Sequence, residues 1–208
     1  LVGSEMCIRD RDDINGVPFF STLYSDAPVI PIIHHIVGWS IFRRELPFPL
    51  SVVGWLCERS IPRIYRNRRF IVVSNSTKQE LVDEFNIQSE KISVVDSGLN
   101  IDLGAVQQKS AHPTVAYVGR IKDYKRVEDV ITAFAKVHGW EPTTRLIIAG
   151  KGETDALKEL AEDLNISDAV DFRGEVDEDE KVRILSSAWL FVTASMKEGW
   201  GLCPIEAN

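Results

Sequence analysis

The chain has 208 residues, a length that accommodates one large domain or two small ones. Its formal net charge of −7 at pH 7 argues against a nucleic-acid partner, which would need a basic surface. A composition of 44% hydrophobic and 26% charged residues is that of a folded globular protein and excludes intrinsic disorder.

The first eleven residues, LVGSEMCIRDR, have neither the basic start nor the apolar core of a signal peptide. We set segment 1–11 aside as an artefactual leader. Further on, no stretch approaches the ~18 consecutive apolar residues of a membrane span. The three cysteines, Cys7, Cys57 and Cys203, show no C-x-x-C spacing and predict neither a disulfide framework nor a zinc site. We therefore expect a cytoplasmic protein without a metal site.

From Asp12 onward, short β-branched runs alternate with amphipathic segments, a pattern typical of α/β proteins with parallel sheets. Continuous apolar runs at 29–34, 70–73 and 92–95 predict strands that are buried on both faces. A capping box at 77–80 predicts that Thr77 caps a helix between the second and third of these strands.

Segment 59–69 carries five arginines next to apolar residues, namely Arg59, Arg63, Arg66, Arg68 and Arg69 beside Trp55, Leu56, Ile61 and Ile64. Such a basic amphipathic pattern suits peripheral contact with an anionic membrane on its inner face, or with a lipid-linked acceptor. Most such faces are simply solvated, and both interpretations stay open here.

Apolar residues no longer recur at regular spacing between residues 100 and 113. This predicts a linker there and a division into domains at 12–107 and 108–208. A second α/β series follows, with expected strands at 114–118, 145–149, 170–173 and 190–193 and a helical pattern in each gap. At the end, Pro204 is expected at the first position of a new helix. We expect the chain to be an interior fragment of a longer protein and to be inactive alone.

The ending EGWGLCPIE, residues 198–206, is the strongest candidate in the sequence for a ligand-binding motif. Glycines between a strand and a helix allow close approach of a ligand, and a helix N-terminus favours an anion. Glu198 in the loop and Glu206 about one turn into the helix can both face the crevice at the carboxyl end of the sheet. Alternatively, Glu206 merely complements the helix dipole and Glu198 is a solvated charge.

Glu198 and Glu206 resemble the E-x7-E motif of retaining glycosyltransferases of the GT-B fold, specifically of family 4, and the resemblance covers nearly everything after Asp12. It implies two Rossmann-like domains facing across a cleft, an acceptor-side domain at 12–107 and a donor-side domain at 108–208, both incomplete. The implied reaction moves a sugar from a nucleotide-diphosphate sugar to an acceptor hydroxyl with retention. It further implies that Glu198 contacts the transferred sugar and Glu206 the ribose, without a cofactor.

Gly119-Arg120 followed by Lys125 resembles the family segment G-R-x4-K, whose Arg and Lys hold the donor diphosphate. Fixed cations would stabilise the negative charge that develops on a diphosphate leaving group. Lys122 and Arg126 add to this cluster of cations. Arg126 is the alternative to Lys125 as the second residue that holds the diphosphate. The other interpretation is a basic loop of solvated side chains.

The remaining candidate site residues rest on the same resemblance. Gly150 and Gly152 resemble a G-x-G loop that borders the nucleotide, although a tight turn needing positive φ explains them equally well. Arg173 lies in a segment similar to the one that reads the base, or is a surface residue. His34, with His35 as the alternative, resembles a histidine near the transferred sugar, or lies in the core or at the surface. The backbone of Gly199, Gly201 and Leu202 completes the expected donor site.

Two rival functions stay open. A GT-B-fold epimerase would also bind a nucleotide sugar, but it would not release the nucleotide to an acceptor. A non-catalytic sugar-binding α/β protein would not need Arg120, Lys125, Glu198 and Glu206 together, so their joint presence favours a transferase.

Overall fold

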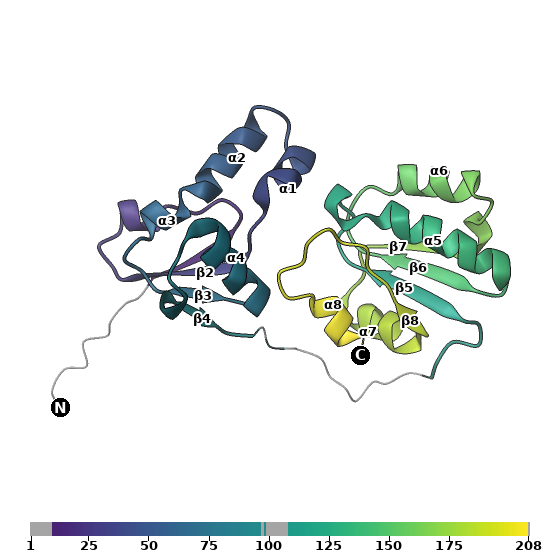
Figure 1. Cartoon of the computed structure of the whole chain (residues 1–208). Helices are drawn as coiled ribbons and strands as arrows, with labels where there is room; N and C mark the ends of the chain where they lie inside the picture. The colour runs from purple at the N-terminus through teal and green to yellow at the C-terminus, as the bar shows by residue number, and fades with distance from the viewer. Residues whose placement is uncertain (1–9, 97, 99–107, 208) are drawn as a thin grey trace. The chain divides into compact units, whose positions relative to one another are not determined.

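The computed structural model describes residues 10–96, 98 and 108–207, with the backbone alone described for Asp10 (Figure 1). The chain divides into two compact units, one comprising Leu1–Ser97 with Glu198–Trp200 and the other Gly98–Lys197 with Gly201–Asn208. The expected boundary at 107/108 has one side outside the described residues. Within the described part of the chain, no helix combines the length and the apolar character needed to cross a membrane.

The first unit is a parallel sheet in the order β1-β2-β3-β4 with helices packed around it. Buried residues from the strands and from helices α3 and α4 form its core, including Ile14, Ile33, Phe70, Ile61 and Leu81. The strands are β1 (Asp10–Asn15), β2 (Val29–His35), β3 (Phe70–Val72) and β4 (Ile92–Val94), and the helices are α1 (Gly38–Glu45), α2 (Leu50–Arg59), α3 (Ile61–Ile64) and α4 (Asn75–Phe85), with 3-10 turns η1 (Ser21–Leu23) and η2 (Ser89–Lys91).

Strand β1 is not expected from the sequence, and its first two residues belong to the segment set aside as a leader. The expectation that the first strand begins at Val29 is therefore wrong. Asp12, a poor strand former, is 1% exposed and accepts hydrogen bonds from the hydroxyls of Ser21, at 2.5 Å, and Tyr65. Burial and the bond to Asp12 raise the pKa of Tyr65 above its ordinary value. These remote partners satisfy a carboxylate that local propensity would exclude from a strand.

The cap of α4 differs from the expected one. Helix α4 begins at Asn75, and the hydroxyl of Ser74 accepts the backbone N–H of Thr77 at 3.1 Å. Thr77 is buried within the first turn, so the predicted capping box at 77–80 is wrong. Ser is the better N-cap of the two residue types, and β3 ends only two residues before Ser74, so the helix begins at the earlier candidate.

A buried glutamate from a different helix caps α1. Glu58 of α2 is 1% exposed, and its carboxylate accepts the backbone N–H groups of Val37 at 2.6 Å and Gly38 at 2.9 Å. These are among the N–H groups that the start of α1 cannot satisfy within the helix. The negative charge also lies at the favourable end of the helix dipole.

We expect Glu58→Gln to lower the free energy of unfolding of the first unit by about 1–3 kcal/mol, because the amide leaves a buried N–H without its acceptor. Chemical denaturation of the two proteins measures the difference. Glu90→Gln, a change at an exposed position, is the matched control and should have little effect. Equal midpoints for wild type and Glu58→Gln would contradict this account of the cap.

The second unit is also a parallel sheet, in the order β7-β6-β5-β8, with helices on both faces (Figure 1). Alternate residues of β5 serve the two faces: Tyr117 packs with α5 and α6, while Ala116 and Val118 pack with α7. The strands are β5 (Thr114–Val118), β6 (Arg145–Ala149), β7 (Val170–Gly174) and β8 (Leu190–Phe191), and the helices are α5 (Val127–Trp140), α6 (Asp155–Asp163), α7 (Glu178–Ser187) and α8 (Leu202–Glu206), with 3-10 turns η4 (Asp123–Lys125) and η5 (Ser167–Ala169).

The expected strands of this unit coincide with β5 and β6 at both ends, whereas β8 is two residues shorter than expected. Pro204 does not begin α8. The helix begins at Leu202 after Gly201, whose φ of 73° suits a glycine, and Pro204 is its third residue. A proline is tolerated there because the N–H groups of the first turn have no partner within the helix.

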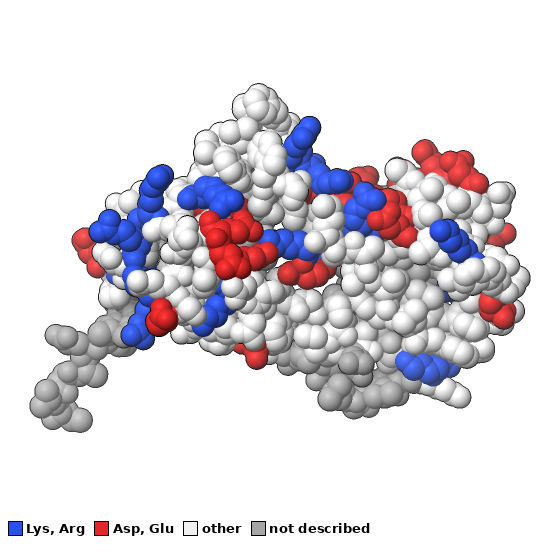
Figure 2. All heavy atoms as spheres, in the orientation of Figure 1, with Lys and Arg blue, Asp and Glu red and all other residues white. Residues whose placement is uncertain are grey.

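Charges of both signs are exposed on the molecule. On the face drawn in Figure 2, basic and acidic side chains both lie on each unit. The face drawn therefore carries a mixed surface, consistent with the ordinary balance of charges in the sequence.

Candidate functional site

The loops that follow the strands of the second sheet are joined by backbone hydrogen bonds. The N–H of Ile121, after β5, donates to the carbonyl of Lys151, after β6, at 2.8 Å. The N–H of Gly150 donates to the carbonyl of Gly174, at the end of β7, at 2.7 Å. The carboxyl end of this sheet is therefore a continuous set of ordered loops, which is where open parallel sheets bind ligands.

Gly150 and Gly152 are required by the close approach of two of these loops. Their φ angles are +144° and +150°, and an added Cβ would lie 1.8 Å from the carbonyl oxygen of Gly119 and 2.3 Å from that of Ile121, respectively. The glycines therefore fit the expected positive φ and a packing role. Their place beside a nucleotide stays a prediction.

Arg120 lies in the loop after β5, with an exposed side chain on a fixed backbone. The hydroxyl of the buried Tyr117 donates to the carbonyl of Arg120 at 2.9 Å. One guanidinium nitrogen donates to the hydroxyl of Tyr124 at 3.0 Å, which uses one of the five N–H donors of the group. Arg120 thus combines a fixed position with donor capacity toward an anion.

Lys125 and Arg126 differ in their surroundings. The Lys125 ammonium lies over the ring of Tyr124, 5.2 Å from its centre. The Arg126 guanidinium binds Asp129 at 2.8 Å and Glu128 at 3.1 Å, and these contacts, the hydrogen bond to Asp129 first, raise the pKa of Arg126. The Arg126 guanidinium is therefore bound to the first turn of α5, and the choice between Lys125 and Arg126 as the second cation beside Arg120 stays a prediction.

Arg173 is engaged at the surface of β7. Its guanidinium binds Asp171 at 2.6 Å and Glu180 at 3.4 Å, and its side chain is half-exposed. These contacts favour the surface interpretation for the side chain and leave its backbone as the group that could read a base.

Glu206 is the most unusual candidate residue in its environment. Its side chain is 10% exposed, one oxygen accepts a hydrogen bond from the Lys181 ammonium at 3.0 Å, and Oε2 is buried without a hydrogen-bond partner. Sequence reasoning missed Lys181, because no local pattern connects two residues that are 25 positions apart.

The loop between β8 and α8 carries the other half of the glutamate motif. Glu198 is exposed, and Glu198–Trp200 are assigned to the first compact unit. Before them, the N–H of Met196 donates to the carbonyl of Tyr124 at 2.9 Å, so this loop begins beside the turn that carries Lys125. Gly201 and Leu202 begin α8.

His34, near the carboxyl end of β2, lies beside an acidic residue that the sequence did not suggest. Its Nε2 is 2.6 Å from Oδ1 of Asp13, which lies on the neighbouring strand β1. The sequence did not suggest that His34 pairs with Asp13, because it did not predict strand β1, which places Asp13 beside β2. Among the described residues, no group of three or more His, Cys, Asp and Glu side chains could hold a metal ion.

The basic segment 59–69 turns its apolar residues inward. Ile61 is fully buried and Ile64 packs against the core of the first unit. Arg59 donates to the carbonyl of Glu84 at 3.0 Å. Two of the four apolar side chains of the pattern are therefore used in the core, whereas Leu56 is 54% exposed, and both interpretations stay open.

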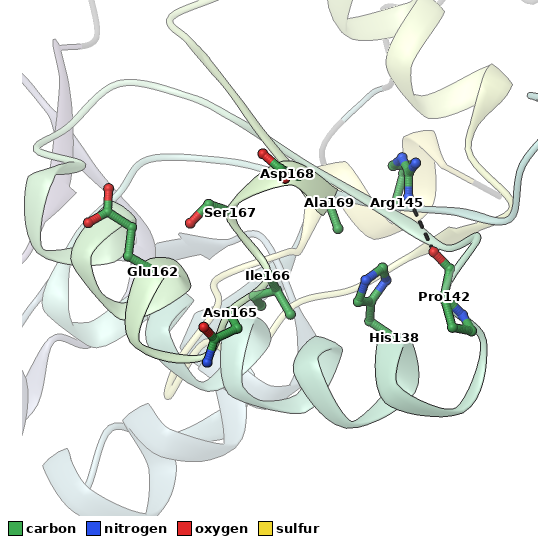
Figure 3. Close-up of a pocket in the computed structure, with 9 residues that line it drawn as sticks. All are labelled: His138, Pro142, Arg145, Glu162, Asn165, Ile166, Ser167, Asp168 and Ala169. Carbon is green, nitrogen blue, oxygen red and sulfur yellow. Dashed lines mark hydrogen bonds between the residues drawn. The ribbon is translucent and has the colours of Figure 1, made fainter.

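A pocket of about 500 Å³ lies at the opposite end of the second sheet, where β6 and β7 begin (Figure 3). No candidate site residue lines it, and its charged groups have both signs. It is therefore separate from the loops at the carboxyl end. The lining residues are His138, Pro142, Arg145, Glu162, Asn165, Ile166, Ser167, Asp168 and Ala169.

The chain is similar to known glycosyltransferases. The family model described as glycosyl transferases group 1 matches residues 104–208. The D-inositol 3-phosphate glycosyltransferase of Mycolicibacterium smegmatis is 32% identical over 156 residues, covering 67% of this chain and 35% of that protein. The O-antigen chain mannosyltransferase RfbU of Salmonella typhimurium is 32% identical over 147 residues, covering 69% and 40%. The chain thus spans well under half the length of these relatives.

Solved structures agree on the fold. Anabaena HepE in complex with UDP and glucose superposes with a TM-score of 0.69 at 17% identity, covering 90% of this chain and 52% of that chain. An S. aureus TarM mutant in complex with fondaparinux, alpha-GlcNAc-glycerol and UDP gives a TM-score of 0.67 at 21% identity, covering 88% and 35%. The structural neighbours are GT-B glycosyltransferases, which confirms the expected fold class.

Proposed function

The chain belongs to the group 1 glycosyl transferases, and on this basis we propose that the protein is a retaining, family 4 hexosyltransferase using a nucleotide-diphosphate sugar. The observation that carries the proposal is the carboxyl end of the second sheet. There, ordered loops carry Arg120 and Lys125, and the helix after β8 carries Glu206 with one carboxylate oxygen in need of a donor.

Arg120 and Lys125 are proposed to hold the donor diphosphate. A leaving diphosphate gains negative charge as the glycosidic bond breaks, and positioned cations stabilise that charge more in the transition state than in the ground state. Gly150 and Gly152 allow the adjoining loops to pack closely enough to border the nucleotide. The HepE structure and the TarM mutant structure both contain UDP, which supports a uridine nucleotide among the candidate donors.

The other candidates are assigned to the sugar and nucleoside. Glu198 contacts the transferred sugar, helped by the backbone of Gly199, Gly201 and Leu202, while Glu206 accepts the ribose hydroxyls. His34, which is paired with Asp13, is proposed to contact the transferred sugar. The backbone of Arg173 borders the base.

The proposed reaction needs no bound metal, cofactor or side-chain base. The acceptor oxygen forms a bond to the anomeric carbon on the face from which the diphosphate leaves, and the bond from that carbon to the phosphate oxygen breaks. The acceptor proton passes to the leaving phosphate oxygen. The protein's part is to fix the donor and to stabilise the charges that develop.

A cytoplasmic location belongs to the proposal and rests on the cysteine pattern and on the use of nucleotide sugars. Peripheral membrane contact through 59–69 has less support, because Ile61 and Ile64 pack in the core. An anionic-vesicle sedimentation experiment addresses that contact separately from catalysis.

The test is turnover by the protein expressed from its whole reading frame. We expect release of nucleoside diphosphate from a UDP- or GDP-hexose when an alkyl glycoside acceptor is present. We also expect the product to keep the anomeric configuration of the donor, as read by NMR. Inversion would contradict the retaining mechanism. Conversion of the donor without an acceptor would indicate the epimerase, and binding without turnover would indicate a sugar-binding protein.

A further inference from the structure

The Glu206 carboxylate is fixed at one oxygen and unsatisfied at the other. Lys181 of α7 reaches it across the two helices, with Nζ 3.0 Å from Oε1, and the same ammonium lies 2.6 Å from Oε1 of Glu178. The side chains of Lys181 and Glu206 are 17% and 10% exposed, respectively. The cluster is therefore shielded from water on the Glu206 side and open to it at Glu178, which is 61% exposed.

An unsatisfied buried carboxylate oxygen is costly, because it has lost its water without gaining a donor. Among the described residues, Glu206 Oε2 and Trp200 Nε1 are the buried side-chain atoms without a hydrogen-bond partner. Native proteins keep few such atoms, and each calls for an explanation, such as a functional role or a bound water or ion. A ligand hydroxyl that donates to Oε2 would remove the penalty.

Helix α8 has packing contacts with α7 in addition to the ion pair. Cys203 and Ala207 pack against the cluster of Ile184, Leu185 and Ala188, which lie in and just after α7. Besides these packing contacts, the Lys181–Glu206 ion pair fixes the orientation of the Glu206 carboxylate. Burial lowers the pKa of Lys181, but its hydrogen bonds to Glu178 and Glu206 outweigh burial, so that its pKa is raised and the ammonium stays charged at neutral pH.

Resting on the proposed function, we propose that Lys181 is a positioning residue of the donor site: it holds Oε1 of Glu206 so that Oε2 is presented to the ribose hydroxyls. Lys181 does not itself touch the donor. A carboxylate that is already oriented need not be ordered when the nucleotide binds. Because that ordering cost is avoided, more of the free energy of the hydrogen bond contributes to nucleotide affinity. The competing explanation is that the Lys181–Glu206 ion pair only holds α8 against α7 and has no effect on nucleotide binding.

The test compares nucleotides with and without ribose hydroxyls. Calorimetry on the protein from the whole reading frame uses UDP and GDP, each beside its 2′,3′-dideoxy analogue. We expect Lys181→Met to lose about tenfold in affinity for the ribonucleotide, the size of one charge-assisted hydrogen bond, and little for the dideoxy form. The donor KM should rise correspondingly with kcat within about twofold, and Lys181→Arg should restore most of the preference.

Glu178→Gln is the matched control, since it removes the other carboxylate bound to Lys181 without changing Glu206, and it should keep the ribose preference within about twofold. Lys181→Gln, which retains a neutral donor, serves as a second variant with an intermediate loss. Equal losses for ribose and dideoxy nucleotides, or a lower Tm with an unchanged preference, would overturn the positioning role.

Failure of the proposed function gives a different pattern. If the wild type binds neither UDP nor GDP, or if Glu206→Gln leaves the ribose preference intact, then Glu206 is not the ribose residue. The role of Lys181 then falls with it. If Glu206→Gln abolishes the preference and Lys181→Met does not, the proposed function stands and the inference about Lys181 is wrong.

Discussion

Replacing Arg120 by alanine is expected to weaken binding of nucleoside diphosphates about ten- to hundredfold, while binding of the nucleoside alone changes less than about twofold. The difference is the loss of charge-assisted hydrogen bonds to phosphate, worth about 1.5–3 kcal/mol. The backbone of Arg120 is held by Tyr117, so the truncated side chain leaves the loop in place. Calorimetry with UDP, GDP and their nucleosides measures both quantities.

Two neighbours provide the comparison. Lys125→Ala should act in the same direction but more weakly, because a flexible ammonium is a point charge rather than a planar fork. Arg126→Asn should leave nucleotide affinity nearly unchanged, since the Arg126 guanidinium already binds Glu128 and Asp129, and Asn tolerates its φ of 54°. Equal losses of diphosphate and nucleoside in Arg120→Ala would remove Arg120 from the phosphate site.

Changing Glu198 or Glu206 to glutamine is expected to affect different kinetic constants. Glu198→Gln should lower kcat about hundredfold with nucleotide binding largely kept, because a carboxylate near the transferred sugar stabilises positive charge that develops in the transition state. Glu206→Gln should mainly raise the donor KM, by about tenfold, because the ribose hydroxyls do not change during the reaction.

Steady-state kinetics of both variants, beside nucleoside diphosphate titrations, distinguishes these outcomes. Glu153→Gln, in the loop after β6, is a control that changes a carboxylate outside the proposed contacts. A loss of nucleotide affinity in Glu198→Gln together with a pure kcat loss in Glu206→Gln would reverse the assignment.

Local sequence patterns predicted the elements whose burial is continuous along the chain. The runs at 114–118 and 145–149 coincide with β5 and β6, since a strand covered on both faces needs apolar side chains at most positions. Segments with fewer such positions were predicted less well. β8 has two residues instead of four, and the helix after β3 is capped by Ser74 instead of Thr77, although both residue types can cap a helix.

The sequence by itself determined the α/β class, most of the strands and the candidate residues of the donor site, because hydrophobic period and motif spacing are local properties. Tertiary structure alone decided which side chains meet. Asp12 is accepted in β1 because Ser21 and Tyr65 satisfy it, and Glu206 is held by Lys181, which is distant in the sequence. Such pairs depend on how strands and helices are arranged in space, and the free energy of a buried polar group depends on those remote partners.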